Sequence, residues 1–96
     1  MPTSSLAAEF RQYYKKLTQE ERAQFKTAVS KFVVDLKAGR GFRPGLRIRG
    51  LARRPGVYEM TWAPDGRATF EYGAPVRDGE PHIIWLRIGT HAILDD

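Results

Sequence analysis

Apolar side chains recur every three or four residues along the first 38 positions of the chain. One apolar stripe covers residues 6–17 and a second covers residues 25–36, and this spacing is typical of helices that bury one face. Residues 18–21 (TQEE) have the spacing of a capping box at the start of the second stripe. We therefore predict helices at about 5–17 and 19–38, joined as a tight antiparallel hairpin.

After Gly41 the period of the pattern changes to two, which is typical of strands. Asp65-Gly66 is a strong signal for a hairpin turn between two of these segments. The pattern predicts strands at about 46–51, 57–62, 67–72 and 82–89. The predicted fold class is α+β, with an N-terminal α-helical hairpin (about 5–38) packed on a three- to four-stranded antiparallel β-sheet (about 45–91). At this length, residues 1–96 are expected to form a single domain.

Alternation within the strands separates an apolar face from a polar face. The apolar set, expected to lie under the helices, is Tyr58, Met60, Trp62, Ala68, Phe70, Tyr72, Ile84, Leu86 and Ile88. The opposite face is expected to carry Glu59, Thr61, Arg67, Thr69, Glu71, Trp85 and Arg87. If the last strand continues past Gly89, His91 falls in phase with Arg87.

The charge is unevenly distributed along the chain. The net charge is +5, and the 18 residues 39–56 contain six arginines and no acidic residue. A basic segment of this kind indicates a polyanionic partner, with nucleic acid as the leading candidate. The alternative is a solvated loop and edge strand, because basic side chains also protect edge strands from unwanted pairing.

Other classes of protein are excluded or disfavoured by composition. The chain has no cysteine, so disulfides and thiolate chemistry are excluded, and two histidines make a zinc site improbable. No apolar run is long enough to span a membrane, and the first residues lack the features of a secretory signal. We expect a cytoplasmic protein with no metal and no small-molecule cofactor.

The polar face contains groups that can cleave RNA. A carboxylate can act as general base, an imidazole as general acid, and guanidinium groups can bind a phosphate and stabilise added charge. The 2′-hydroxyl of RNA supplies the nucleophile, and its attack on the adjacent phosphorus expels the 5′-oxygen and leaves a 2′,3′-cyclic phosphate. The alternative is an ordinary solvated sheet face, in which Glu59 forms an ion pair with Arg67 or Arg87.

The stretches GVYEMTWAPDGRATFEYG and HIIWLRIGTH, after a basic segment at 46–54, resemble the RelE/ParE superfamily of toxins. The resemblance covers about residues 19–94 and is greatest to the RelE-like mRNA interferase branch. It implies a RelE-like, microbial-ribonuclease-like fold in the toxin of a type II toxin–antitoxin system. Most members begin with a short strand before the first helix, and residues 1–5 leave little room for one.

The resemblance also implies roles for individual residues. Glu59 would be the base, Arg67 would bind the scissile phosphate, Arg87 would stabilise the transition state and His91 would be the acid. The contacts to RNA would come from a basic surface and one aromatic ring, and this set is Arg47, Arg49, Arg53, Arg54 and Trp85. For Trp85, the residues by themselves favour a packing role over stacking on a base.

The implied activity is a metal-independent endoribonuclease that cuts mRNA, either on the ribosome or free of it. Its partners would be RNA and an antitoxin protein, and no membrane. Two alternatives remain open at this point. One is a ParE-like, non-catalytic inhibitor of DNA gyrase, and the other is an inactive basic module that binds RNA or protein.

Overall fold

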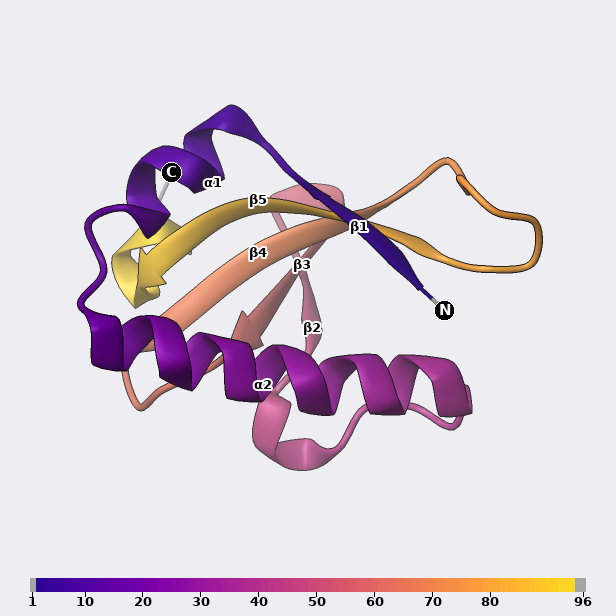
Figure 1. The fold of residues 1–96 in the computed structure, drawn as a ribbon, viewed down its shortest axis with the longest axis horizontal. Coiled ribbons are helices and arrows are strands. Elements are labelled where there is room, and N and C mark those ends of the chain that lie inside the picture. The colour runs from indigo at the N-terminus through magenta and orange to yellow at the C-terminus, as the bar shows by residue number, and fades with distance from the viewer. Residues whose placement is uncertain (1, 95–96) are drawn as a thin grey trace.

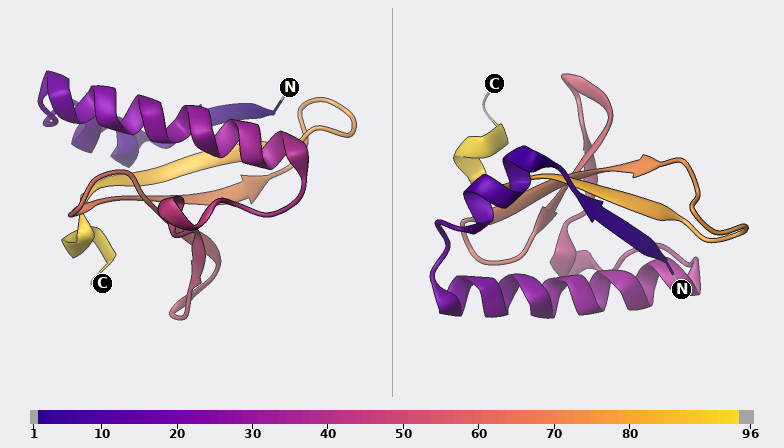
Figure 2. Two further views of the ribbon diagram at one scale, coloured as in Figure 1. Left: turned by 90° about the horizontal axis from the view of Figure 1, so that it is seen from below. Right: turned by 45° about the horizontal axis from the view of Figure 1, so that its top comes forward.

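A single sheet with two helices on one side forms the framework of the protein, as a computed structural model shows for residues 2–94 (Figures 1 and 2). The elements in chain order are β1 (Thr3–Leu6), α1 (Ala8–Tyr14), α2 (Gln19–Ala38), the 3-10 turn η1 (Pro44–Leu46), β2 (Arg49–Leu51), β3 (Arg54–Thr61), β4 (Gly66–Gly73), β5 (His82–Thr90) and the 3-10 turn η2 (His91–Leu94). The chain is thus α+β. In the described part of the chain, neither helix is long and apolar enough to cross a membrane.

The long helix α2 is confirmed with the predicted boundaries. Thr18 accepts a hydrogen bond from the backbone N–H of Glu21, whose side chain accepts one from the backbone N–H of Thr18. This reciprocal pair satisfies two N–H groups that a helix start otherwise leaves without partners. The helix ends at Gly39, whose φ of 69° lies in the left-handed region that favours glycine.

The predicted helical hairpin is wrong. Residues 3–6 form β1 rather than the first turn of a helix, so α1 begins at Ala8 and has only seven residues. Figure 2 shows α1 crossing the end of β5 instead of lying antiparallel along α2. Phe10 attaches it to the core, with ring centroids 5.7 Å from Phe25 and 6.3 Å from Trp85.

The sheet has five strands, not three or four, and it is not wholly antiparallel. Its order is β1-β5-β4-β3-β2, and β1 pairs with β5 in parallel. Hydroxyl groups hold this edge: Thr3 Oγ1 lies 2.7 Å from His82 Nδ1, and Ser5 Oγ lies 3.2 Å from His82 Nε2. The expectation that residues 1–5 leave little room for a strand is therefore wrong.

The expected faces are confirmed in β3 and β4 but not throughout β5. A bulge lies where Thr69 pairs with Arg87 but Phe70 pairs with Trp85, so that Leu86 has no partner. An extra residue in one strand reverses the side on which the preceding side chains lie. Ile83 and Trp85 are consequently buried, whereas the prediction placed Ile84 and Leu86 under the helices.

Aromatic rings form the centre of the core beneath α2. The Trp85 ring centroid lies 5.3–5.4 Å from those of Phe25, Phe32 and Phe70. Phe32 and Phe70 are almost completely buried, and Trp85 is only 4% exposed. This packing fixes β4 and β5 beneath the helices.

Two segments project on the opposite side of the sheet from the helices. The first is the β2–β3 hairpin and the second is η2, and Figure 2 (left) shows both below the sheet. The predicted strand at 46–51 is shorter than expected, because residues 44–46 form η1 and β2 begins at Arg49. The two projections border the polar face.

Candidate active site

A row of three polar side chains crosses the middle of the face that is opposite the helices. Glu59 of β3 pairs with Thr69 of β4, and Thr69 pairs in turn with Arg87 of β5. Residues that face each other across neighbouring strands point to the same side of a sheet. Because strands lie about 4.8 Å apart, the backbones of Glu59 and Arg87 are separated by about 10 Å. The residues expected on one face at these positions are therefore brought into one row.

Glu59 is a buried carboxylate held by an arginine. Its side chain is 5% exposed, and its Oε1 accepts a hydrogen bond from Arg49 Nε at 3.1 Å. The partner considered from the sequence was Arg67 or Arg87, whereas the structure places Arg49 of β2 there. A buried charge requires a partner of this kind. The Arg49 side chain is itself 73% exposed, so it can also meet a ligand.

Arg87 is oriented by two neighbouring elements. Its Nε lies 2.8 Å from Glu9 Oε1 of α1, and its Nη1 donates to the carbonyl of Ile93 in η2 at 3.5 Å. Its side chain is 23% exposed. These contacts hold the guanidinium at the rim of a hollow of about 100 Å³ between η2 and the β2–β3 hairpin.

Arg53 and Arg54 line the same hollow as Arg87. They lie at the tip of the β2–β3 hairpin, and Thr69 forms part of the floor. Three guanidinium groups around one small hollow favour an anion, and guanidinium groups match phosphate geometry with paired hydrogen bonds. This hollow is the place where the polar face could hold a phosphodiester.

Arg67 and His91 lie at the other end of the face, beside the β3–β4 turn. Arg67 Nη1 donates to the carbonyls of Ala63, Pro64 and Gly66, the last at 2.9 Å. His91 does not continue the last strand in phase with Arg87, because β5 ends at Thr90 and His91 begins η2.

The imidazole of His91 is attached to the β3–β4 turn. His91 Nδ1 makes a hydrogen bond with Asp65 Oδ1, and both side chains are exposed. This hydrogen bond, aided by the charges of His91 and Arg67, holds the pKa of Asp65 below its usual value despite partial desolvation. Asp65 thereby orients the imidazole, and Nε2 is left as the ring nitrogen that could meet a substrate.

The four expected catalytic residues therefore form two groups. Glu59 and Arg87 belong to the row across Thr69, and Arg67 and His91 stand beside the β3–β4 turn. The structure does not bring the four into a single pocket.

The expected RNA-contacting residues are also divided. Arg53 and Arg54 face the hollow at Arg87, Arg49 pairs with Glu59, and Arg47 lies at the end of η1 in a separate groove beside α2. The prediction that Trp85 contacts RNA is wrong. Its ring is buried among Phe25, Phe32 and Phe70 and is not available to stack on a base. The cause is the bulge in β5, which the alternation of residues 82–89 does not reveal.

Three residues that help to build the site receive no individual functional role from the sequence. Thr69 was placed on the polar face but not in a row, Asp65 was assigned only to a turn, and Glu9 lies 78 positions from its partner Arg87. Asp65-Gly66 carried the signal of a turn, and nothing in the sequence signals that this turn meets the end of β5. Within residues 2–94, no group of three or more His, Cys, Asp or Glu side chains could hold a metal ion.

The fold defined by this sheet and these helices is shared with bacterial and archaeal toxins of known structure. No family model and no curated protein matches the sequence. Solved structures do match. One is YafQ from the E. coli DinJ–YafQ complex, with a TM-score of 0.65, 15% identity and full coverage of both chains.

Two further structures show the same likeness. The RelB–RelE antitoxin–toxin complex from Methanococcus jannaschii matches with a TM-score of 0.60 and 16% identity, over 94% of each chain. A copper-bound mutant toxin from Helicobacter pylori matches with a TM-score of 0.64 and 17% identity, over 98% of this chain and 99% of that one. The RelE-like fold implied by the sequence resemblance is therefore confirmed. At these identities the likeness establishes the fold.

Proposed function

We propose that this protein is the toxin of a type II toxin–antitoxin system and acts as an endoribonuclease on its polar sheet face. The observation that carries the proposal is the row Glu59–Thr69–Arg87, with Arg53 and Arg54 beside it. A carboxylate and several guanidiniums on one face can perform a transesterification of RNA. The matching toxin structures support the same conclusion at the level of the fold.

In the proposed reaction, the 2′-oxygen of the substrate forms a bond to the adjacent phosphorus and the bond from phosphorus to the 5′-oxygen breaks. Glu59 accepts the 2′ proton or orients the group that does so. Arg87 binds the non-bridging oxygens, where negative charge grows in the transition state, and Arg67 binds the phosphate that follows along the face toward the β3–β4 turn. His91 gives a proton to the departing 5′-oxygen. The products are a 2′,3′-cyclic phosphate and a free 5′-hydroxyl.

The burial of Glu59 fits the role of a base better than that of an ordinary surface charge. Its side chain is 5% exposed and lies next to Thr69, which is also buried. A carboxylate that leaves water needs a compensating gain, and Arg49 supplies only one hydrogen bond here. A 2′-hydroxyl that reaches Glu59 would add a second.

The proposed partners are RNA and an antitoxin. The DinJ–YafQ and RelB–RelE pairs are toxin–antitoxin complexes, and this chain shares the fold of their toxins. An antitoxin would bind this protein and block growth arrest. Co-expression with the product of a neighbouring small gene would show this as restored growth.

The test of the proposed function is induced expression in bacteria, with growth and mRNA 5′ ends followed together. Wild-type protein should arrest growth and produce new mRNA 5′ ends. Arg87→Ala should lose both, because removal of one donor to a developing oxyanion lowers a rate by about 10²–10³-fold.

Arg77→Ala is the matched control, since Arg77 lies in the exposed loop between β4 and β5. It should behave like wild type. Equal cleavage by wild type and Arg87→Ala would overturn the assigned site. Growth arrest without new 5′ ends would overturn the ribonuclease and point to a gyrase-type target.

A further inference from the structure

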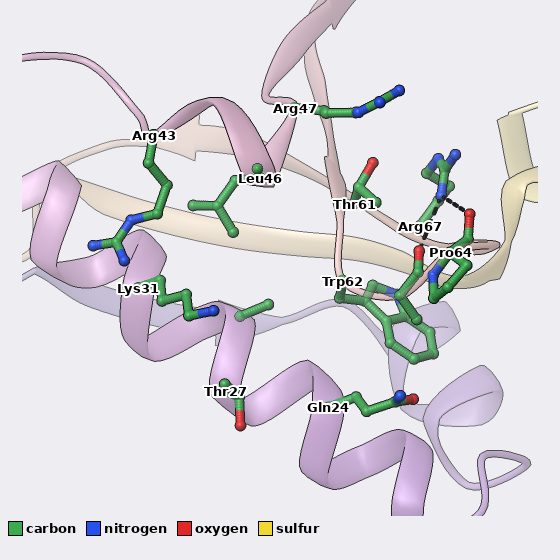
Figure 3. Close-up of a pocket in the computed structure, with 13 residues that line it drawn as sticks. Gln24, Thr27, Lys31, Arg43, Leu46, Arg47, Thr61, Trp62, Pro64 and Arg67 are labelled. Atoms are coloured by element: carbon green, nitrogen blue, oxygen red, sulfur yellow. Dashed lines mark hydrogen bonds between the residues drawn. The ribbon is translucent and has the colours of Figure 1, made fainter.

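A second basic hollow lies outside the row of polar residues, between α2, η1 and the β3–β4 turn. Its volume is about 420 Å³, and Figure 3 shows its walls. We call it the α2 groove. The residues that the argument uses are Lys31, Arg43, Arg47, Thr61, Trp62 and Arg67. Leu46, which is 4% exposed, anchors η1 to the core and so fixes the wall opposite α2.

The charge of the α2 groove is positive. Four of the described residues that line it are cations and none is acidic. Arg43 is neutralised by Asp35, with Arg43 Nε 2.8 Å from Asp35 Oδ2. Lys31 and Arg47 form no ion pair with any residue in the range 2–94. An anionic ligand would supply the missing counter-charge.

Two residues that line the α2 groove each have a buried polar atom that lacks a partner. Thr61 Oγ1 and Trp62 Nε1 are buried, and neither has a hydrogen-bond partner among the described residues. Trp62 is 8% exposed, and Figure 3 shows its indole between Pro64 and the α2 residue Gln24. Buried polar groups of native proteins are usually hydrogen-bonded, so each exception needs an explanation. Because an indole N–H only donates, its partner must present an acceptor atom, and a phosphate oxygen is one.

The backbone at Arg47 gives an independent indication. Among the described residues, Arg47 is the one non-glycine residue with a positive φ, at 47°. Such a conformation is unfavourable for most side chains and is often retained where function requires it. In Figure 3 the Arg47 side chain extends to the end of the groove where Thr61 and Arg67 lie. Lys31 extends into the groove from the opposite wall.

We propose that the α2 groove binds a backbone phosphate of single-stranded RNA, next to the segment that is cleaved. The inference rests on the proposed function, because it takes RNA as the ligand. Thr61 pairs with Arg67, and both lie on the same sheet face as the row Glu59–Thr69–Arg87. The groove thus begins at the end of the polar face and continues round the edge of the sheet to α2. A chain of nucleotides can follow this path and place one phosphate at each basic group.

Lys31→Gln tests the proposal, with Lys26→Gln as the matched control on the same helix. Lys26 is exposed and lines a different, apolar hollow. The probe is a short fluorescent RNA in which every 2′-oxygen is methylated, so that it binds but cannot be cleaved. Lys31→Gln should weaken binding by about tenfold, since a hydrogen bond to a charged group is lost. The slope of log Kd against log salt should fall by about 0.7, the value for one phosphate contact on a single strand.

A second readout reports on the groove itself. The chain has two tryptophans, so its indole N–H groups give two NMR signals. Addition of the methylated RNA should shift the signal of Trp62 and leave that of Trp85, in the core, unchanged. A shift of Trp62 that also disappears in Lys31→Gln would establish the contact.

Neither the RNA affinity nor the Trp62 signal depends on cleavage. These measurements can therefore contradict RNA binding in the α2 groove whether or not the protein is a ribonuclease. The inference is overturned if wild type and Lys31→Gln bind the RNA with the same Kd and salt slope. It is also overturned if the Trp62 signal does not respond to RNA, or if it responds instead to a poly-glutamate peptide, which would indicate an acidic protein segment. Loss of mRNA cleavage with intact, Lys31-dependent RNA binding would reject the ribonuclease and retain the groove.

Discussion

The two faces of the sheet are built from the same strands but are stabilised differently. Beneath the helices, Phe10, Phe25, Phe32, Phe70 and Trp85 pack as rings in contact, and burial of apolar surface stabilises the fold. On the other face, charged side chains are held in pairs: Arg49 with Glu59, Arg87 with Glu9, and His91 with Asp65. Such pairs contribute little to stability when they are exposed.

This difference separates residues that stabilise the fold from residues that are expected to act on the substrate. A substitution on the helix-covered face should change the free energy of unfolding. A substitution on the polar face should change activity while the fold persists. The following predictions test the separation, beginning with the largest expected effect.

Trp85→Ala should lower the free energy of unfolding by about 3–5 kcal/mol, because it leaves a cavity among Phe25, Phe32 and Phe70. Urea unfolding followed by circular dichroism measures this. Trp85→Phe should cost less and should bind RNA with the affinity of wild type. A stable Trp85→Phe variant with weakened RNA binding would show that Trp85 contacts RNA.

His91→Ala should lower the rate of RNA cleavage by about 10²-fold, the contribution of one general acid, with little change in Tm. The same variant should raise the pKa of Asp65 toward its ordinary value, because the hydrogen bond that lowers it is gone. An NMR titration of the Asp65 carboxyl checks this second effect. An unchanged pKa of Asp65 would show that His91 and Asp65 are not paired in solution.

Gly66→Ala should destabilise the fold by about 1–3 kcal/mol, the usual cost of an overpacked site. A Cβ at position 66 would lie 2.6 Å from the ring of Trp62. The expected loss is read from a lower Tm. Gly45→Ala is the control, because a Cβ there meets no atom within 4 Å. Equal Tm values for the two variants would contradict the close packing of Gly66 on Trp62.

The smallest effect is expected from Asp35→Asn, which removes the ion pair with Arg43. Hydrogen bonds from the side chain and backbone of Arg43 lower the pKa of Asp35 to about 2. A carboxyl whose pKa is lowered in the folded state stabilises the protein above its unfolded pKa of about 3.9, and this contribution disappears as the pH falls toward 2. Wild type should therefore be more stable than Asp35→Asn at pH 6, and the difference should vanish once the pH falls below about 2. A difference that does not change with pH would contradict the pairing.

Much of the fold could be predicted because apolar residues recur with a clear period along the long helices and strands. The capping box and the apolar stripe of α2, and the alternation in β3 and β4, depend only on neighbours in sequence. The edge strand β1 could not be predicted in this way. Its sequence, TSSL, has no apolar alternation, and it exists because His82 and the backbone of β5 supply distant partners.

The candidate site was predictable to the same extent. Alternation placed Glu59, Thr69 and Arg87 on one face, and the register confirms that row. The bulge at Leu86 depends on how β4 and β5 pair, and the alternation within β5 does not reveal it. The predicted side of the sheet for Trp85 was therefore wrong. The pairing of Glu9 with Arg87 arises from tertiary packing and has no local signal.

The most direct test of cleavage on the polar face uses purified protein and two RNAs. One reaction contains EDTA and no ribosomes, and a parallel reaction contains ribosomes with Mg²⁺. The first RNA is unmodified. The second carries a single 2′-deoxynucleotide at the position where the first is cut. We expect the first RNA to yield a 2′,3′-cyclic phosphate and the second to remain intact at that position. Cleavage of both RNAs at the same rate, or of neither, would contradict a reaction that uses the 2′-hydroxyl on this face.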